Sequence, residues 1–139
     1  MATTGIEIPN GYAWLMTTLN IASVTTLATG GVFADLAPSG IAPPFLVFGF
    51  QGGRDIIGSE AIRLLSQGVF FIRAVGLASQ YATLVSIMAV VDPLVQRQGG
   101  TAGGNTIMMA NREQAINLTQ QLNNVQWVYT GGLYRLYIV

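Results

Sequence analysis

Val-Gln-Trp-Val-Tyr-Thr (residues 125–130), Gly131-Gly132 and Leu-Tyr-Arg-Leu-Tyr-Ile-Val (residues 133–139) form the last stretch of the chain. Two runs rich in β-branched and aromatic residues, separated by Gly-Gly, are typical of a β-hairpin. Glycine suits the tight turn, because it adopts the positive φ angles required there without a steric penalty. The stretch therefore predicts a C-terminal β-hairpin with its turn at Gly131-Gly132.

The two faces of this expected hairpin differ in polarity. A two-residue turn would place Tyr129 opposite Tyr134 and Trp127 opposite Leu136. One face would then be apolar or aromatic throughout, carrying Val125, Trp127, Tyr129, Tyr134, Leu136 and Ile138. The other face would be mixed, carrying Gln126, Val128, Thr130, Leu133, Arg135 and Tyr137. The apolar face needs a core to lie on, and the preceding residues must supply it.

The first half of the chain is expected to form an opening helix followed by strands. Residues 1–9 should be an extended N-terminal arm, and Asn10 can cap a helix whose apolar residues follow helical spacing. A short helical turn is expected at residues 24–28. Strands are expected at residues 32–36, 45–50 and 59–77, with a polar loop at residues 51–58 and a bulge or break at Gly68.

The second half contains a longer helix that begins near Ser79. Pro93 should kink or restart that helix, with Asp92 as the new cap. The glycine-rich residues 98–105 are expected to be a mobile loop, because glycine loses much conformational entropy on ordering. A strand at residues 106–112 and a polar connector at residues 114–124 lead to the hairpin. The order predicts a single α+β domain over residues 1–139, a mostly antiparallel β-sheet with helices packed on one face, closing in a C-terminal β-hairpin.

The composition indicates that much of the protein's surface is covered in its working state. Hydrophobic residues make up 51% of the chain and charged residues 9%, with a formal net charge of zero. An ordinary soluble domain has roughly 25% charged residues. Assembly with other subunits or contact with a membrane would remove the apolar surface from water.

A membrane span is the less favoured of these two explanations. Residues 74–91 carry no charge, but Gly76, Ser79 and Gln80 interrupt them, and their first part is expected to be a strand. The N-terminal residues also lack the basic region and apolar stretch of a signal peptide. The sequence therefore favours assembly.

The chain lacks the residue types that several kinds of catalytic and binding site require. The chain has no cysteine, histidine or lysine, which excludes disulfides, most zinc sites, histidine acid–base catalysis, P-loops and Schiff bases. Five Gly-Gly pairs are interpreted as turns, since none has the spacing of a phosphate loop. The carboxylates are scattered, and no basic patch suits nucleic acid. We expect no catalytic residue, metal or cofactor, and hence no enzyme.

Arg73 is the most informative charged residue, because it lies inside an apolar strand. By strand alternation it shares a face with Val69, Phe71 and Val75. Its guanidinium either reaches solvent at the edge of the sheet or pairs with a carboxylate across a subunit interface. The residues proposed for contacts with other subunits or partners are Arg54, Asp55, Glu60, Arg73, Arg112 and Arg135.

The layout from Tyr12 to Val139 also suggests a family. It comprises an opening helix, the Val32-Phe33 strand, a proline segment ending in Pro43-Pro44-Phe45, residues 66–76 (SQGVFFIRAVG), a helix, and the closing Gly131-Gly132-Leu-Tyr-Arg-Leu-Tyr. This layout resembles the tail terminator, or tail completion, proteins of long-tailed bacteriophages and prophages.

The resemblance implies a structural role in the virion. Such proteins form a ring, usually a homohexamer, at the head-proximal end of the tail tube, where they stop tube polymerisation. The expected partners are other copies of the chain, the tail tube protein and the head-side connector, with DNA only passing through the lumen and no membrane involved. The protein would be made in the host cytoplasm. A neutral, lysine-free chain suits a lumen that should not hold DNA.

Two alternatives remain open at the level of sequence. The chain could be another structural phage protein, such as a connector, baseplate or minor capsid component. It could also be a small-molecule-binding module with an apolar pocket.

Overall fold

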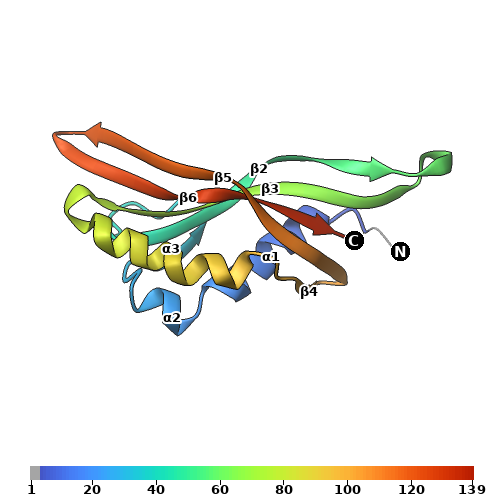
Figure 1. The fold of residues 1–139 in the computed structure, drawn as a ribbon, viewed down its shortest axis with the longest axis horizontal. Coiled ribbons are helices and arrows are strands. Elements are labelled where there is room, and N and C mark those ends of the chain that lie inside the picture. Colours follow the sequence, from blue (N-terminus) through green and yellow to red (C-terminus); the bar gives the residue numbers. More distant parts are fainter. Residues whose placement is uncertain (1–3) are drawn as a thin grey trace.

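The computed structural model describes residues 4–139 of the chain (Figure 1). Two helices precede the first three strands, and a third helix precedes the last three strands, which is an α+β order. The elements are α1 (Glu7–Leu19), α2 (Ala22–Thr25), β1 (Val32–Ala34), β2 (Phe45–Ile57), η1 (Ser59–Ala61), β3 (Arg63–Leu77), η2 (Ala78–Gln80), α3 (Tyr81–Val95), β4 (Gly100–Ala102), β5 (Asn105–Leu122) and β6 (Val125–Ile138).

The strands form one six-stranded sheet in the order β1-β2-β3-β6-β5-β4. Only β1 and β2 are parallel, and every other neighbouring pair is antiparallel. The helices lie together on one side of the sheet (Figure 1). This arrangement confirms the predicted fold class, including a hairpin at the C-terminal end, which β5 and β6 form.

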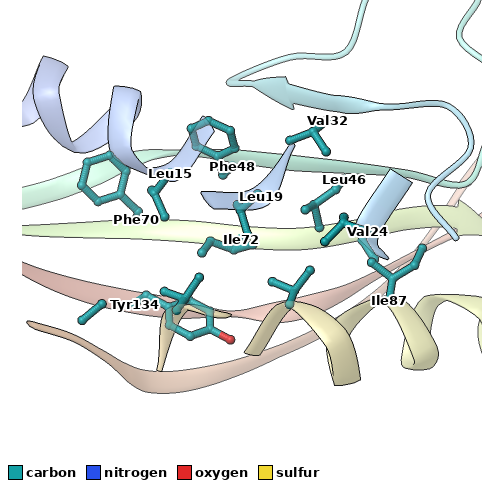
Figure 2. Close-up of a cluster of buried hydrophobic side chains, with 14 of the residues drawn as sticks. Leu15, Leu19, Val24, Val32, Leu46, Phe48, Phe70, Ile72, Ile87 and Tyr134 are labelled. Atoms are coloured by element: carbon teal, nitrogen blue, oxygen red, sulfur yellow. The ribbon is translucent and has the colours of Figure 1, made fainter. Parts of the chain in front are cut away.

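The core lies between the helices and one face of the sheet. Alternate residues of β3 and β6 are buried, as expected for strands covered on one face. Side chains from α1, α2 and α3 meet those of β2, β3 and β6 there (Figure 2). Tyr134 is fully buried, and its hydroxyl donates a hydrogen bond to Asp92 Oδ1 at 2.7 Å. Burial and this bond raise the pKa of Tyr134 far above its ordinary value.

The predicted turn at Gly131-Gly132 is wrong. Both glycines lie inside β6, which pairs with β3 on one side and β5 on the other. A Cβ atom on Gly131 would lie 2.0 Å from the carbonyl oxygen of Ile72, so glycine is needed there for close approach of two strands. The turn instead falls at Asn123 and Asn124, whose φ angles are +50° and +62°. Asparagine tolerates this left-handed conformation, which two-residue hairpin turns require.

The new register changes the faces of the strand. In a continuous strand, odd and even residues point to opposite sides. Trp127 and Tyr129 therefore lie on the face opposite the helices, while Tyr134, Leu136 and Ile138 are in the core. Val125, which is 40% exposed, is also outside the core, so the grouping of all six residues on one apolar face was wrong.

Two segments interpreted as loops belong to strands. Residues 51–58 were expected to be a polar loop, but β2 continues to Ile57 with a register shift between Phe50 and Gly52. Residues 114–124 were expected to be a connector, but β5 extends to Leu122. Gly68 does not break β3 either; a Cβ there would lie 2.8 Å from Ile8 Cδ1, so its role is close packing against α1.

Helix α1 begins earlier than expected. It starts at Glu7, so residues 7–9 are helical rather than part of an extended arm, and residues 1–3 lie outside the described part of the chain. Asn10 is inside the helix and does not cap it. Its buried side chain donates hydrogen bonds to Gly103 O at 3.1 Å and to Asn105 Oδ1. This polar contact joins α1 to the turn between β4 and β5.

Helix α3 does not restart at Pro93. It runs from Tyr81 to Val95, with Pro93 in its last turn, where the missing backbone donor removes only one helical bond. Asp92 therefore caps no new helix, and its carboxylate instead accepts the Tyr134 bond.

Residues 98–105 have more structure than a plain loop. Gly100–Ala102 form β4, which pairs with β5 through a turn at Gly103 and Gly104. Asn105, at the end of this segment, is buried and donates a hydrogen bond to Val139 O at 3.0 Å. The mobility of the segment in the free chain stays a prediction, which hydrogen exchange would test.

Candidate functional site

The most distinctive surface is the sheet face opposite the helices, which we call the open face. Its central residues on β3 and β6 are half-buried, except Val75, which is buried. They are Val69, Phe71, Arg73 and Val75 on β3, and Trp127, Tyr129, Leu133 and Arg135 on β6. No helix of the described chain covers this face (Figure 1).

A groove of about 520 Å³ opens on this face near the β5–β6 turn. Strand pairing places Phe45, Val75 and Tyr129 in one row across β2, β3 and β6. The wall residues are mostly apolar, with one arginine, one aspartate and one asparagine among them. They are Asp35, Leu36, Ala37, Phe45, Val47, Arg73, Val75, Leu122, Asn123, Val125, Trp127 and Tyr129.

Arg73 is held between two aromatic rings in this groove. Its guanidinium carbon lies 4.6 Å from the ring centre of Phe71 and 5.1 Å from that of Tyr129. Cation–π attraction stabilises this position. Its Nε atom is buried without a hydrogen-bond partner, and no carboxylate in residues 4–139 forms an ion pair with it. Strand β3 lies between β2 and β6 in the sheet, so Arg73 is not at the edge of the sheet.

Arg135 is engaged within the chain. Its Nε donates to Glu113 Oε1, its Nη2 donates to Glu113 Oε2 at 3.3 Å, and its Nη1 donates to Gln67 Oε1 at 3.0 Å. The hydrogen bond with Glu113 raises the pKa of Arg135 above its ordinary value. Arg54, which is exposed, shares a shallow hollow with Arg135, Gly53 and Val69.

Asp55 is also used inside the chain. It accepts a hydrogen bond from Ser66 Oγ at 2.6 Å and pairs with Arg63 at 3.5 Å. Arg63 in turn lies 3.6 Å from the buried carboxylate of Glu7. These contacts hold the start of α1 against β2 and β3.

Glu60 and Arg112 lie apart from the other predicted residues. Glu60 is exposed at the β2–β3 turn with a φ angle of +63°, and it forms no ion pair within residues 4–139. Arg112 is exposed on β5 and pairs across the sheet with Tyr134, which places it on the helix side. The six predicted residues therefore form no single cluster. Arg54 and Arg135 line the same hollow, and of the six only Arg73 lines the groove.

Sequence reasoning missed the exposed apolar side chains at the two ends of the sheet. Near the β5–β6 turn, Leu118 is 55% exposed, Leu122 49% and Val125 40%. Near the β2–β3 turn, Ile57 is 55% exposed and Ile62 57%. The low charge of the chain was the only sequence feature that indicated exposed apolar surface. Where that surface lies could not be predicted, because it depends on where the strands end.

Helix α3 also has an uncovered apolar side. Leu84, Ile87, Val91 and Val95 are buried against the core, whereas Val85 is exposed. The stretch Ala78–Val95 has the length and composition of a candidate membrane span, with mean hydropathy 1.3 and 22% of its residues buried. One side of this stretch is therefore already occupied by the sheet.

The described residues offer no metal centre. Within residues 4–139, no three histidine, cysteine, aspartate or glutamate side chains are grouped so that they could hold a metal ion. What the open face offers is an apolar groove with one stacked arginine, which suits an apolar occupant carrying an acceptor group.

Comparison with known proteins identifies a solved structure with a similar fold. No protein-family model matches the chain, and no curated protein matches it. Among solved structures, the chain is similar to one from the virion of a native gene transfer agent particle, with a TM-score of 0.66 and 13% identity, covering 88% of this chain and 91% of that chain. A second solved chain, 16% identical, has a TM-score of 0.48 and covers 89% of this chain and 94% of its own. At 13% identity, the first likeness shows that the two chains share a fold.

Proposed function

We propose that the protein is a structural component of a phage-like virion, where it forms the ring of a tail terminator. In this role it caps the tail tube, stops tube polymerisation and joins the tail to the head-side connector. The observation that carries the proposal is the fold shared with a chain of a gene transfer agent virion, which extends over 88% of the protein.

The surface chemistry supports an assembled state. Strand β5 from Gln114 to Leu122 is exposed on nearly every residue, on both sides of the sheet, and the exposed residues include Leu118 and Leu122. Burial of apolar surface contributes roughly 25 cal/mol per Å². A stable interface buries about 800 Å² on each partner. Strand pairs that extend beyond the helices could supply such an area to neighbouring subunits.

The charge of the chain suits a ring through which DNA passes. Six arginines balance six carboxylates, so the formal net charge is zero. Neutralising phosphates with lysine and arginine is the main source of nonspecific DNA affinity. A neutral ring would let the genome move through its lumen without binding it tightly.

The proposal is tested by adding the purified protein to polymerising tail tube protein and measuring tube lengths by electron microscopy. A terminator should stop growth, giving rings at one end of short tubes. Unchanged tube length, together with no end-bound density, would contradict it. Particles that lack the protein separate this role from the connector and baseplate alternatives: loss of a terminator should give tails of irregular length that lack heads.

A small-molecule-binding role is the second candidate, and the groove is the observation that favours it. Its volume of about 520 Å³ lies within the usual range of ligand pockets. Native mass spectrometry of the purified protein would reveal a retained ligand as a mass above that of the chain. The assembly role is preferred, because a ligand in the groove would leave the apolar ends of the sheet uncovered.

A further inference from the structure

We propose that the groove on one copy of the protein receives the β2–β3 turn, residues 57–62, of a second copy. In this contact the carboxylate of Glu60 meets the guanidinium of Arg73, while Ile57 and Ile62 cover the apolar walls. The inference rests on the proposed ring, and it names the surfaces through which neighbouring subunits join.

The groove requires an occupant that is apolar with one negative group. Phe45, Val75 and Trp127 line it with apolar surface, and Arg73 supplies a positive charge held by Phe71 and Tyr129. The other charged wall residue, Asp35, already accepts a hydrogen bond from the Tyr12 hydroxyl at 2.6 Å. Arg73 itself is half-buried and lines the groove, and within residues 4–139 no carboxylate forms an ion pair with its guanidinium.

The β2–β3 turn has the complementary composition. In sequence, Ile57 and Ile62, both more than half exposed, flank Glu60, whose exposed carboxylate forms no ion pair within residues 4–139. Glu60 and Ala61 are held at φ angles of +63° and +58°, which are unfavourable for residues other than glycine. Tight turns use this left-handed conformation, and here it fixes the direction in which the Glu60 side chain leaves the turn.

The positions of the two surfaces exclude a contact within one chain. In Figure 1 the β2–β3 turn lies at the right end of the molecule, and the β5–β6 turn that borders the groove lies at the left end. A turn at one end and a groove at the other produce a head-to-tail contact between copies. Contacts of this type close into rings when the rotation between subunits permits it. Each copy offers one turn and one groove, so every subunit of a closed ring is satisfied.

Charge reversal tests the pairing. Glu60→Arg places like charges together and should weaken self-association about tenfold or more. It leaves the backbone strain at position 60 unchanged, since both side chains are unbranched at Cβ. Arg73→Glu should have the same effect. The double variant, or an equal mixture of the two single variants, should restore assembly, because each arginine then meets a carboxylate. Arg97→Glu, which alters another exposed arginine at positive φ, serves as the control.

Cysteine cross-linking gives a second readout that does not depend on Arg73→Glu folding correctly. The natural chain has no cysteine, so an introduced pair reports only its own contact. Ser59→Cys in the turn combined with Ala37→Cys in the groove wall should give a ladder of covalent multimers on oxidation. Ser59→Cys with Thr17→Cys, on an exposed position of α1, should give no such ladder. Adding Glu60→Arg to the first pair should remove it.

The outcomes separate this inference from the proposed function. Rings that form equally well with Glu60→Arg, or equal cross-linking by both cysteine pairs, would overturn the head-to-tail contact and leave the tail terminator role standing. Restored assembly in the mixture, together with a ladder specific to the first pair, supports it. A small molecule found in the groove of assembled rings would overturn the contact as well.

Discussion

Gly131 on β6 lies so close to the backbone of Ile72 on β3 that a Cβ on the glycine would be 2.0 Å from the isoleucine carbonyl oxygen. Gly131 is paired with Arg73 in the same ladder, so the close approach occurs beside the arginine of the groove. The glycine pair near the C-terminus therefore serves to pack two central strands, and it does not turn the chain.

Gly131→Ala should destabilise the protein by about 1–3 kcal/mol, since the obstacle is backbone and the strands must separate to admit the methyl group. Thermal unfolding measures this change. Thr130→Ala, one residue earlier in the same strand, adds no atoms and serves as the control. Equal stability of Gly131→Ala and the unaltered chain would show that the strands do not approach so closely.

Asn124→Gly should preserve or raise the stability of the β5–β6 turn. Asn124 has a φ angle of +62°, and Asn-Gly is the preferred sequence for a two-residue turn of this hand. Asn124→Val should instead be unfavourable by about 1–2 kcal/mol, because a β-branched residue resists positive φ. Hydrogen exchange at the end of the hairpin would detect the local loss. If Asn124→Val and Asn124→Gly showed the same hydrogen exchange at the end of the hairpin, the turn would not lie at Asn124.

Tyr134→Phe should reduce stability by about 1–2 kcal/mol, because it removes the hydrogen bond to Asp92 at 2.7 Å. Tyr137→Phe, on the open face, should have little effect. The pKa of Tyr134 is raised by burial in the folded state, while in the unfolded chain it is about 10. The neutral phenol therefore contributes its full stability below about pH 10, and that contribution is lost as the pH rises further. Denaturation curves from neutral to alkaline pH should show a shallower decline for Tyr134→Phe. An identical decline would indicate that the phenol ionises freely in the fold.

Leu136→Ala should mainly lower the folding stability, whereas Trp127→Ala should mainly weaken self-association. Leu136 is fully buried beneath the helices, so its truncation should cost about 2–5 kcal/mol of folding free energy. Trp127 lines the groove on the open face, so its truncation should alter stability less and self-association more. Calorimetry and light scattering on both variants separate the two effects. A Trp127→Ala variant that unfolds while Leu136→Ala remains stable would reverse the two faces of β6.

The parts of the fold that sequence predicted are those with strong local signals. Helical spacing found α1 and α3, and the apolar runs found β1 and the first half of β2, because each pattern depends on residues close in the chain. The full length of β5 could not be predicted. Residues 114–122 are rich in glutamine and mostly exposed, and they form a strand only because β6 pairs with them.

The glycine pair shows why the candidate site was harder to predict than the fold. Gly-Gly between apolar runs is compatible with a turn or with close strand packing, and only the neighbouring strand β3 decides between them. The interpretation as a turn placed Tyr129 on the same face as Tyr134. The stacking of Arg73 on Tyr129 was therefore hidden, although the isolation of Arg73 in an apolar strand had already marked it as unusual.

The most direct test of the account is the mass of the purified protein in solution, measured by native mass spectrometry over a dilution series. The account predicts a closed species whose mass is a whole multiple of the 14.8 kDa chain, six being the number expected for a tail terminator, with no ladder of open intermediates. A well-behaved 14.8 kDa monomer at every concentration, unchanged when tail tube protein is added, would contradict it.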